Sequence, residues 1–244
     1  MKHDEFAPHE VEWDAQRSAR FWNFHSSSGA HEQRYFGRQN GLEVANLLKR
    51  KVLRNAQTIL DYSCGKGDVL LACAQLLREE QRFHGADISR GSLDAAELRL
   101  KSFPNFSGTT LLEKIPSALP DGYFDLVIVT EVLEHIAPDQ LGAVLGEINR
   151  VTSQGGKVFI TTPYQEDLQR DKTICPDCGC IFHRWQHMTS WSIDEVADKL
   201  GEFGFSKRTC QNIQWGPWLL KLYFKVTGRK GNGIYYLGEK VAKA

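Results

Sequence analysis

Apolar runs and helical patterns alternate along the middle of the chain. An apolar run of strand length recurs five times, and helical periodicity fills the intervals between the runs. Strands that alternate with helices predict a doubly wound α/β fold, in which a parallel sheet carries helices on both faces. The predicted strands are 58–63, 83–88, 109–114, 125–131 and 157–163, and the predicted helices are 38–54, 68–80, 92–103 and 138–153.

The alternation stops after the fifth predicted strand and resumes near residue 190. Residues 164–190 show neither period and contain the sequence CPDCGCIFHRWQH. Ser192 and Glu195 then form an S-x-x-E capping box, which predicts a helix start. Two further strand patterns, 207–214 and 233–241, bring the expected sheet to seven mostly parallel strands. The segments expected from this pattern are an aromatic helical cap at 1–54, a core at 55–163, a Cys/His insertion at 164–190 and a final helix and strands at 191–244. Because the insertion leaves the carboxyl end of the fifth strand, we expect it on the acceptor side of the sheet.

Composition limits the partners that the chain can take. Its 244 residues are 41% apolar, which suffices for a sizeable core, and 30 basic residues balance 30 acidic ones. A neutral chain has no overall field to attract nucleic acid, and TEVL stands after the fourth strand where a nucleic-acid or protein methylase would carry an N-P-P-Y-like tetrapeptide. No run reaches the 18 or so apolar residues of a membrane span, so a cytoplasmic protein is expected.

The stretch TILDYSCGKGDVL, residues 58–70, has the composition of a cofactor turn. A strand delivers Asp61 into a turn with Gly65 and Gly67, and the following helix directs its backbone N–H groups at whatever binds there. Asp61 alone could equally cap a strand or helix. A dinucleotide fingerprint needs a third glycine where this chain has Leu70, which argues against NAD.

Four motifs in order resemble the class I S-adenosylmethionine-dependent methyltransferases. They are acid-x-S-x-G-x-G at Asp61, Ser63, Gly65 and Gly67, with Ser63 in place of the family's first glycine; the strand end GADIS; LPDGYFDLVIVTEVLEHI; and EINRVTSQGGKVFITTP. The resemblance runs from about residue 33 to residue 205. It implies a Rossmann-like seven-stranded fold and methyl transfer from S-adenosylmethionine.

The resemblance also implies roles for individual cofactor residues. The acid at the end of the second strand would accept both ribose hydroxyls, and the apolar residue after it would face the adenine. An acid after the third strand would meet the adenine amino group, and carbonyls near the glycine turn and the fourth strand would meet the methionine ammonium. The residues at these positions are Asp87 for the ribose, Ile88, Glu113 and the backbone of Lys114 for the adenine, and Gly65 and Thr130 for the ammonium.

A methyl acceptor that carries a hydroxyl group needs a base, because the proton must leave as the new bond forms. His135 follows the fourth strand in EVLEHI and titrates near neutral pH, so it is the candidate catalytic residue. The alternative is that His135 packs and hydrogen-bonds in a structural role.

The cysteine and histidine cluster in the insertion predicts a metal site. Cys175, Cys178, His183 and His187 form C-x2-C-x4-H-x3-H, which is enough for tetrahedral zinc, and Cys180 is a spare ligand. Four protein ligands would fill the shell, so the zinc would be structural and would pin a short loop. Two alternatives stay open: FHRWQH lines the substrate pocket, or the cysteines are free thiols.

Two aromatic segments flank the core. The stretch at 21–41 is either a helix docked on the core or a cover over the cofactor, with Tyr35 near the methionine end. Residues 215–230 interleave aromatic and basic side chains and either cover the sheet and acceptor pocket or contact a membrane surface that presents a lipid-linked acceptor.

The function expected from these patterns is methylation of a small molecule, with an oxygen of a sugar or natural-product metabolite as the favoured acceptor. The choice of acceptor is an analogy with bacterial enzymes of similar sequence. The alternatives are N-methylation of a small molecule, and a non-catalytic cofactor-binding or zinc-mediated interaction module.

Overall fold

The computed structural model describes residues 6–27 and 33–242. Residues 1–5, 28–32 and 243–244 lie outside the described part, and the first two stretches belong to the predicted N-terminal cap. A seven-stranded sheet in the order β4-β3-β2-β5-β6-β10-β9 forms the centre of the molecule, as the sequence predicts. Its strands are β2 (Thr58–Tyr62), β3 (Arg82–Asp87), β4 (Phe106–Leu111), β5 (Phe124–Thr130), β6 (Thr152–Pro163), β9 (Phe205–Ile213) and β10 (Gly233–Lys240).

Strand β10 lies antiparallel between β6 and β9, whereas the pairs from β4 to β6 are all parallel. The carboxyl ends of β2, β3, β5 and β6 therefore meet at one edge of the sheet. In an open α/β sheet this edge is where ligands bind. The residues that end β2, β3 and β5 and those that follow them are the ones that the sequence assigns to the cofactor.

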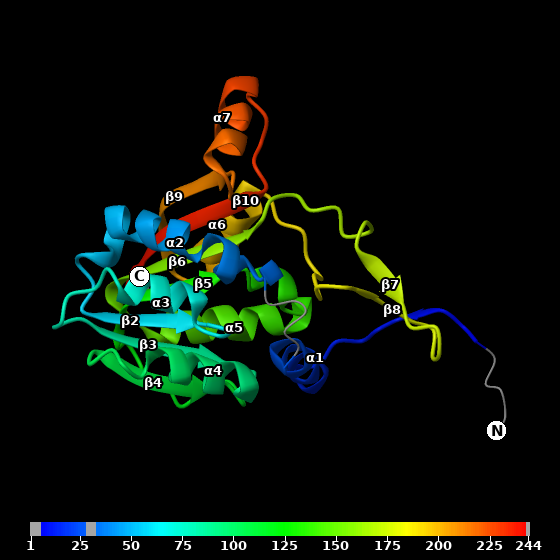
Figure 1. The fold of residues 1–244 in the computed structure, drawn as a ribbon, viewed down its shortest axis with the longest axis horizontal. Coiled ribbons are helices and arrows are strands. Elements are labelled where there is room, and N and C mark those ends of the chain that lie inside the picture. Colours follow the sequence, from blue (N-terminus) through cyan, green and yellow to red (C-terminus); the bar gives the residue numbers. More distant parts are fainter. Residues whose placement is uncertain (1–5, 28–32, 243–244) are drawn as a thin grey trace.

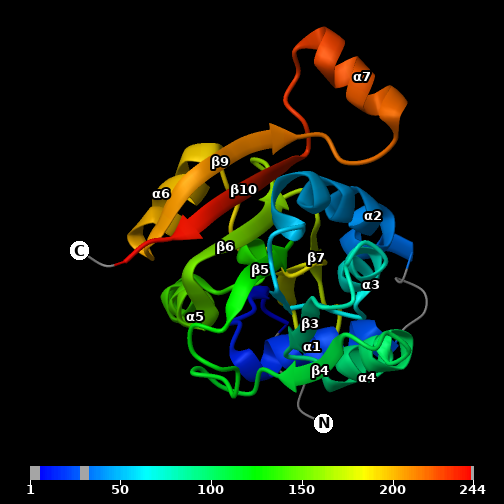
Figure 2. The same cartoon turned by 90° about the vertical axis from the view of Figure 1, so that its left-hand side faces the viewer.

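Helices cover both faces of the sheet (Figure 2). One core cluster joins the helices α2 to α4 to side chains such as Ile59 and Ile128, and the other joins α5 and α6 to side chains such as Leu60 and Val127. Neighbouring residues of one strand enter opposite clusters because successive strand side chains point to opposite faces. The helices are α1 (Ala15–Ser27), α2 (Phe36–Leu48), which continues as the π-helical turn η2 (Lys49–Leu53), α3 (Asp68–Ala74), α4 (Arg90–Leu100), the short 3-10 turn η3 (Leu133–His135), α5 (Pro138–Val151) and α6 (Ile193–Glu202).

The predicted element boundaries are wrong by three or more residues at four places. One is the end of α4, which lies at Leu100 and not at residue 103. Strand β4 lies three residues earlier than expected, so Glu113 and Lys114 follow the strand. Helix α3 ends at Ala74 and not near residue 80. Strand β6 begins at Thr152, before the glycine pair that was expected to end the preceding helix, because Thr152 already has extended backbone angles. The predicted capping box is confirmed, with Ser192 and Glu195 bonded to each other's backbone N–H groups.

Two parts project from the sheet and its helices (Figure 1). The insertion forms a hairpin of β7 (Lys172–Ile174) and β8 (Cys180–His183), and β1 (His9–Glu10) pairs with β8 to make a second, three-stranded sheet. Helix α7 (Trp218–Thr227) stands away from the sheet, with no buried residue. In the part of the chain that the structure describes, no helix is both long and apolar enough to span a membrane.

Candidate active site

The glycine turn after β2 adopts the left-handed conformations that its sequence indicates. Gly65 and Gly67 have φ values of 54° and 74°, and Ser63, which replaces the family's first glycine, also has a positive φ of 65°. A Cβ at Gly67 would lie 3.2 Å from Ala96 and from Leu100 of α4, so a side chain there would push the two elements apart. Above Gly65 a Cβ would meet no atom within 4 Å, which leaves open space beside the turn.

Asp61 is a buried acid without a partner. Its side chain is 1% exposed, and neither carboxylate oxygen has a hydrogen bond. Burial raises the pKa of Asp61 well above its usual value, and the nearby carboxylates of Asp87 and Asp68 raise it further. An unpaired buried acid is costly, so a polar or cationic ligand group is the missing partner that this position suits.

Asp87 ends β3 next to the same turn and organises it. One carboxylate oxygen accepts the backbone N–H of Gly65 at 2.8 Å, and the other accepts that of Ser89 at 2.8 Å. Each oxygen keeps a further lone pair. The carboxylate can therefore also accept the ribose hydroxyls, as the resemblance implies, without losing these bonds. Ile88 follows as a half-buried apolar residue.

The other predicted cofactor residues lie around this edge to different degrees. Thr130 is the last residue of β5 and pairs with Thr161 of β6. Tyr35 is the half-buried residue that precedes α2. Glu113 and Lys114 are exposed, two and three residues past the end of β4, although the chain still follows the sheet there because the Leu112 N–H bonds to the Asp87 carbonyl at 2.9 Å.

The charge at this edge favours a cationic cofactor. Besides Asp61 and Asp87, two glutamates lie at this edge. Burial raises the pKa of Glu131 to about 7, and it raises the pKa of Glu134 well above its usual value. The raised pKa values show that these acids lack a cationic partner. The ammonium and sulfonium groups of S-adenosylmethionine would favour the charged carboxylates, whereas the pyrophosphate of a dinucleotide would oppose them. The residues present therefore fit S-adenosylmethionine.

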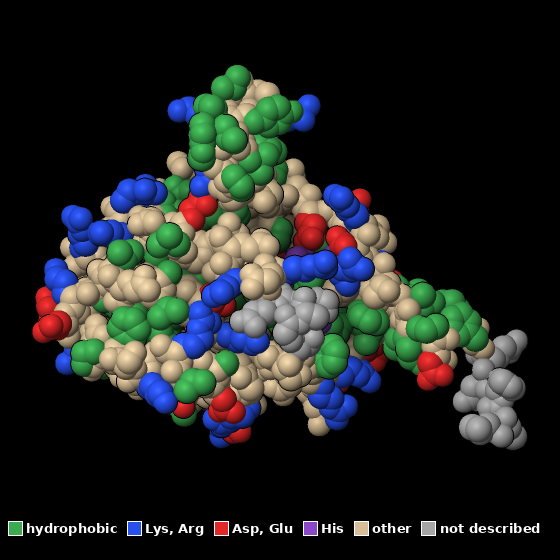
Figure 3. All heavy atoms as spheres, in the orientation of Figure 1, with side chains coloured by type: hydrophobic (Ala, Val, Ile, Leu, Met, Phe, Trp, Pro, Cys, Tyr) green, Lys and Arg blue, Asp and Glu red, His purple; other side chains and the backbone are tan. Residues whose placement is uncertain are grey.

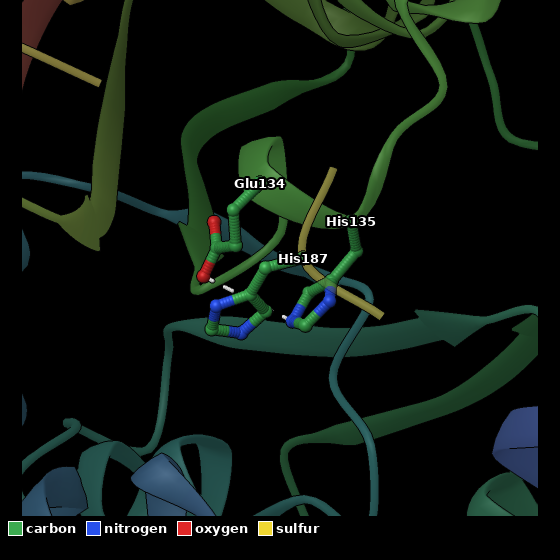
Figure 4. A group of neighbouring side chains, drawn as sticks. All are labelled: Glu134, His135 and His187. Carbon is green, nitrogen blue, oxygen red and sulfur yellow. Dashed lines mark ion pairs between the residues drawn. The ribbon is translucent and has the colours of Figure 1, made fainter. Parts of the chain in front are cut away.

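A second group of titratable side chains lies just beyond β5, where η3 meets the insertion. Glu134 is fully buried in η3; one carboxylate oxygen accepts the hydroxyl of Thr162 at 2.9 Å, and the other has no hydrogen-bond partner. Its backbone carbonyl accepts the Met188 N–H at 2.7 Å, which holds the end of the insertion against η3. Figure 4 shows the Glu134 carboxylate turned toward the rings of His135 and His187.

His187 is held by Glu166. The Nδ1 atom of His187 hydrogen-bonds with a carboxylate oxygen of Glu166. A carboxylate can only accept, so the proton of this bond lies on Nδ1, and the Nε2 atom is left for a second contact. A histidine fixed in this way by an acid is arranged to take a proton from a substrate.

His183 stacks on His187, with ring centroids 4.7 Å apart. Its Nδ1 accepts the backbone N–H of His187 at 3.1 Å, which places its own ring proton on Nε2, 4.0 Å from Glu166. Burial lowers the pKa of His183 from its usual value, and the neighbouring His187 lowers it further. His183 therefore packs beside His187 as a ring that is hard to protonate.

His135, the base expected from the sequence, is enclosed on several sides. Its ring contacts those of Trp22 and His187 at centroid distances of 4.9 and 4.7 Å, and its Nδ1 is buried without a hydrogen-bond partner. Burial lowers the pKa of His135 well below its usual value, and His187 contributes to the shift. The structure thus places His135 in the cluster, beside a second histidine that is better oriented by a carboxylate.

The four predicted zinc ligands do not form one group. Cys175 and Cys178 lie at the turn of the β7–β8 hairpin, while His183 lies at its other end, paired with Lys172, and His187 lies beyond it. In the described ranges, His183 and His187 gather with Glu166, and His187 also gathers with Glu134 and His135, but no cysteine joins either group. The spacing along the chain could not show this because a hairpin separates residues at its turn from those at its ends.

A cavity of about 430 Å³ borders the cluster. His183, His187, Met188 and Phe182 line it on one side, and Val11 and Trp13 of the N-terminal segment line it on the other. His187 thus lies both in this cavity wall and beside the residues that follow β5. The cavity is large enough for a small acceptor molecule.

Sequence reasoning missed Glu134 and Glu166. Glu134 lies next to the predicted His135 in the same motif and follows the apolar pair Val132 and Leu133, which was the signal available for it. Glu166 lies in the stretch without periodicity, where the sequence carries no signal for its position.

Comparison with known proteins decides the family. A family model described as a methyltransferase domain matches residues 30–209, well over half of the chain. The chain belongs to the class I S-adenosylmethionine-dependent methyltransferases. It is therefore an enzyme that uses S-adenosylmethionine, and the non-catalytic alternative falls away.

Relatives of this methyltransferase have been named for one substrate. A demethylmenaquinone methyltransferase of Anoxybacillus flavithermus is 28% identical over 205 residues, or 76% of this chain and 83% of the relative. One of Bacillus licheniformis is 32% identical over 175 residues, or 66% of this chain and 73% of the relative.

Solved structures confirm the fold of the methyltransferase. A 1,6-didemethyltoxoflavin-N1-methyltransferase of Burkholderia thailandensis, solved with S-adenosylhomocysteine, has a TM-score of 0.67 at 15% identity and covers 97% of this chain and 95% of its own. A methyltransferase of Methanosarcina mazei has a TM-score of 0.60 at 17% identity and covers 81% and 98%.

Proposed function

We propose that this methyltransferase acts on a small molecule at an ionisable hydroxyl oxygen, such as that of a sugar or natural-product metabolite, and that His187 removes the proton. The observation that carries the proposal is the Glu166–His187 pair next to the buried Glu134. A neutral amine already has a lone pair of electrons and needs no base to activate it, whereas a hydroxyl group must lose its proton. The Glu166–His187 arrangement therefore favours an oxygen acceptor.

The steps assigned to the chain are binding, orientation and proton transfer. S-adenosylmethionine supplies an electrophilic methyl group on its sulfonium. We place its ammonium end at Asp61 of β2 and Glu131 after β5, and its adenosine at Asp87 and Ile88. The Nε2 atom of His187 accepts the hydroxyl proton while the oxygen forms its bond to the methyl carbon and the carbon–sulfur bond breaks, which leaves S-adenosylhomocysteine. Glu166 stabilises the imidazolium that results.

A second candidate acceptor is a hydroquinone ring, methylated at carbon. The relatives are named demethylmenaquinone methyltransferases, and removal of a ring hydroxyl proton would make the neighbouring ring carbon nucleophilic. The same base serves both reactions. The two candidates differ in the product, which carries an O-methyl group in one case and a C-methyl group in the other.

The test is a screen of acceptors followed by histidine variants. The full chain is incubated with S-adenosylmethionine and with sugars, phenols, hydroquinones and amines, and S-adenosylhomocysteine and methylated product are measured. We expect turnover with a hydroxyl compound, and we expect His187→Asn to lower kcat by about 10²–10⁴-fold with unchanged affinity for S-adenosylmethionine.

The controls separate the two histidines of the cluster. His84→Asn changes a histidine bonded to Thr110 on the far side of β2, so kcat should stay unchanged. His135→Asn should lower kcat far less than His187→Asn does. Turnover with amines alone would contradict the proposal, and loss of turnover in His135→Asn with normal turnover in His187→Asn would return the role of base to His135.

A further inference from the structure

The turn of the β7–β8 hairpin gathers three cysteines that the site described above does not use. The Cys175 N–H bonds to the Cys180 carbonyl at 2.8 Å, and the Gly179 N–H bonds to the Cys175 carbonyl at 3.0 Å, so the backbone folds tightly around Cys178. The thiol of Cys178 interacts with the thiols of both Cys175 and Cys180. The described structure has no disulfide among them, and all three are free thiols.

The N-terminal strand brings a histidine to the same turn. β1 pairs in parallel with β8, with His9 opposite Cys180, and the His9 N–H bonds to the Gly179 carbonyl at 3.0 Å. The Nε2 atom of His9 lies 3.2 Å from the Cys180 sulfur. Gly179 permits this approach, because its φ is 75° and a Cβ there would lie 2.7 Å from the Ala7 carbonyl oxygen.

The ring of His9 is held in the tautomer that a metal ligand needs. Its Nδ1 lies 3.0 Å from the Ala7 carbonyl, which can only accept, so Nδ1 carries the proton. Nε2 therefore presents a lone pair toward Cys180. Histidines that bind metals donate their other N–H to a carbonyl or carboxylate in the same way.

The backbone around Cys175 suits a thiolate. The backbone N–H groups of Cys178 and Asp177 point to the Cys175 sulfur. A turn that directs amides at a sulfur stabilises the deprotonated form, which is the form that binds metal. These contacts come from the turn itself and do not depend on His183 or His187.

We propose that His9, Cys175, Cys178 and Cys180 bind one zinc ion. In the structure no three of these four ligand atoms lie within 4.8 Å of one another, so side-chain rotation must complete the shell. Cys178 is exposed at the turn and is free to rotate without moving a strand. Three thiolates and one imidazole form a closed tetrahedral shell, and the three thiols release their protons to solvent on binding.

The ion would join two segments that are far apart in the sequence. It would fix β1, and with it the start of α1, against the insertion hairpin. Helix α1 carries Trp22, whose ring packs on His135, so the zinc would hold the cover of the acceptor side in place. Its role is structural, since no ligand position remains for a substrate.

The test measures metal in the full chain and does not depend on finding the acceptor. We expect about one zinc per chain by elemental analysis, and a cobalt-substituted protein with the absorption of tetrahedral cobalt bound to thiolates. His9→Gln and Cys180→Ser should each weaken zinc affinity by roughly tenfold or more. Cys210→Ser is the matched control, because its sulfur bonds to the Ile193 carbonyl in the main sheet region.

Two results would overturn the proposal. One is a chain without zinc that still binds none when zinc is added to the reduced protein. The other is a zinc content that stays the same in His9→Gln and Cys180→Ser but falls in His183→Gln and His187→Gln. That result would support the ligand set suggested by the sequence spacing. Circular dichroism of each variant shows that the main sheet has folded.

Discussion

At the scale of single residues, Asp61 combines a stability cost with a binding role. Its carboxylate is buried without a hydrogen bond, and its pKa is raised. We expect Asp61→Asn to stabilise the ligand-free protein by roughly 1–3 kcal/mol at neutral pH, because the folded wild type must keep this buried carboxyl protonated at a pH where the unfolded chain has released the proton, and the amide has no such cost. The same variant should lose most of its affinity for S-adenosylmethionine. Thermal unfolding and calorimetric titration measure the two effects.

The sign of the pH dependence follows from the raised pKa of Asp61. Above the usual value of 3.8 the unfolded chain has released this proton while the folded chain still holds it, so stability falls as pH rises through that window. We therefore expect the advantage of Asp61→Asn to shrink toward pH 4. An advantage that does not change with pH would show that the charge on Asp61 is not its source.

Residue patterns predicted the positions where local chemistry sets the structure. Gly67 was identifiable because only a residue without a side chain fits the left-handed turn against α4. Glu166 was not identifiable because its partner, His187, is 21 residues away and meets it only after the insertion has folded back. The orienting acid of the proposed base is therefore a property of tertiary structure.

At the scale of elements, helix α7 exposes apolar side chains, although its Lys221 forms an ion pair with Glu43 of α2. Trp218, Leu219 and Val226 are 69%, 62% and 76% exposed, and the helix sequence contains lysines but no acid (Figure 3). Lys225 and the following Arg229 leave this surface positively charged. An exposed apolar helix with basic neighbours suits the surface of an anionic membrane.

We therefore expect the protein to bind vesicles that contain phosphatidylglycerol more strongly than vesicles of phosphatidylcholine alone. Trp218→Ser should lower the partition coefficient by about tenfold or more, because a large apolar side chain no longer enters the interface. Leu42→Ser changes a leucine of α2 that is 64% exposed and should have no effect. Equal co-sedimentation of Trp218→Ser and the wild type would remove α7 from membrane binding.

Elements with a clear period were predicted well, and those without one were not. The S-x-x-E box marked the start of α6 because the cap is local. The hairpin β7–β8 carries no alternation of buried and exposed residues, since β7 is exposed throughout. Its strands exist through pairing with each other and with β1, which a single segment of sequence cannot reveal.

At the scale of the whole molecule, cofactor binding should stabilise the fold. S-adenosylhomocysteine at about 100 times its Kd should add about 2.7 kcal/mol, which corresponds to a rise in Tm of roughly 5–10 °C. NAD should give no rise, because Leu70 is fully buried behind the turn and the sheet edge is acidic. A shift with NAD as large as that with S-adenosylhomocysteine would contradict this account of the turn.

The overall sheet was predictable because a repeated alternation of strands and helices has few solutions. The antiparallel placement of β10 between β6 and β9 was not, because strand order depends on which edges remain for the last strands. The edge that suits the cofactor was predictable with the sheet, because it is the edge where the carboxyl ends of the parallel strands meet. The sequence predicted that the insertion lies on the acceptor side, but the contacts of the insertion with η3 and of α1 with His135 required the structure.

The pairing of β1 with β8 has a consequence for the order of folding. His9 and Cys180 are 171 positions apart in the chain, so their contact closes a very long loop. Closing such a loop costs entropy, and this cost falls once the intervening chain has become compact. The two residue pairs of β1 with β8 offset little of it. The central sheet should therefore form first, and the pairing of β1 with β8 should form last and open most readily.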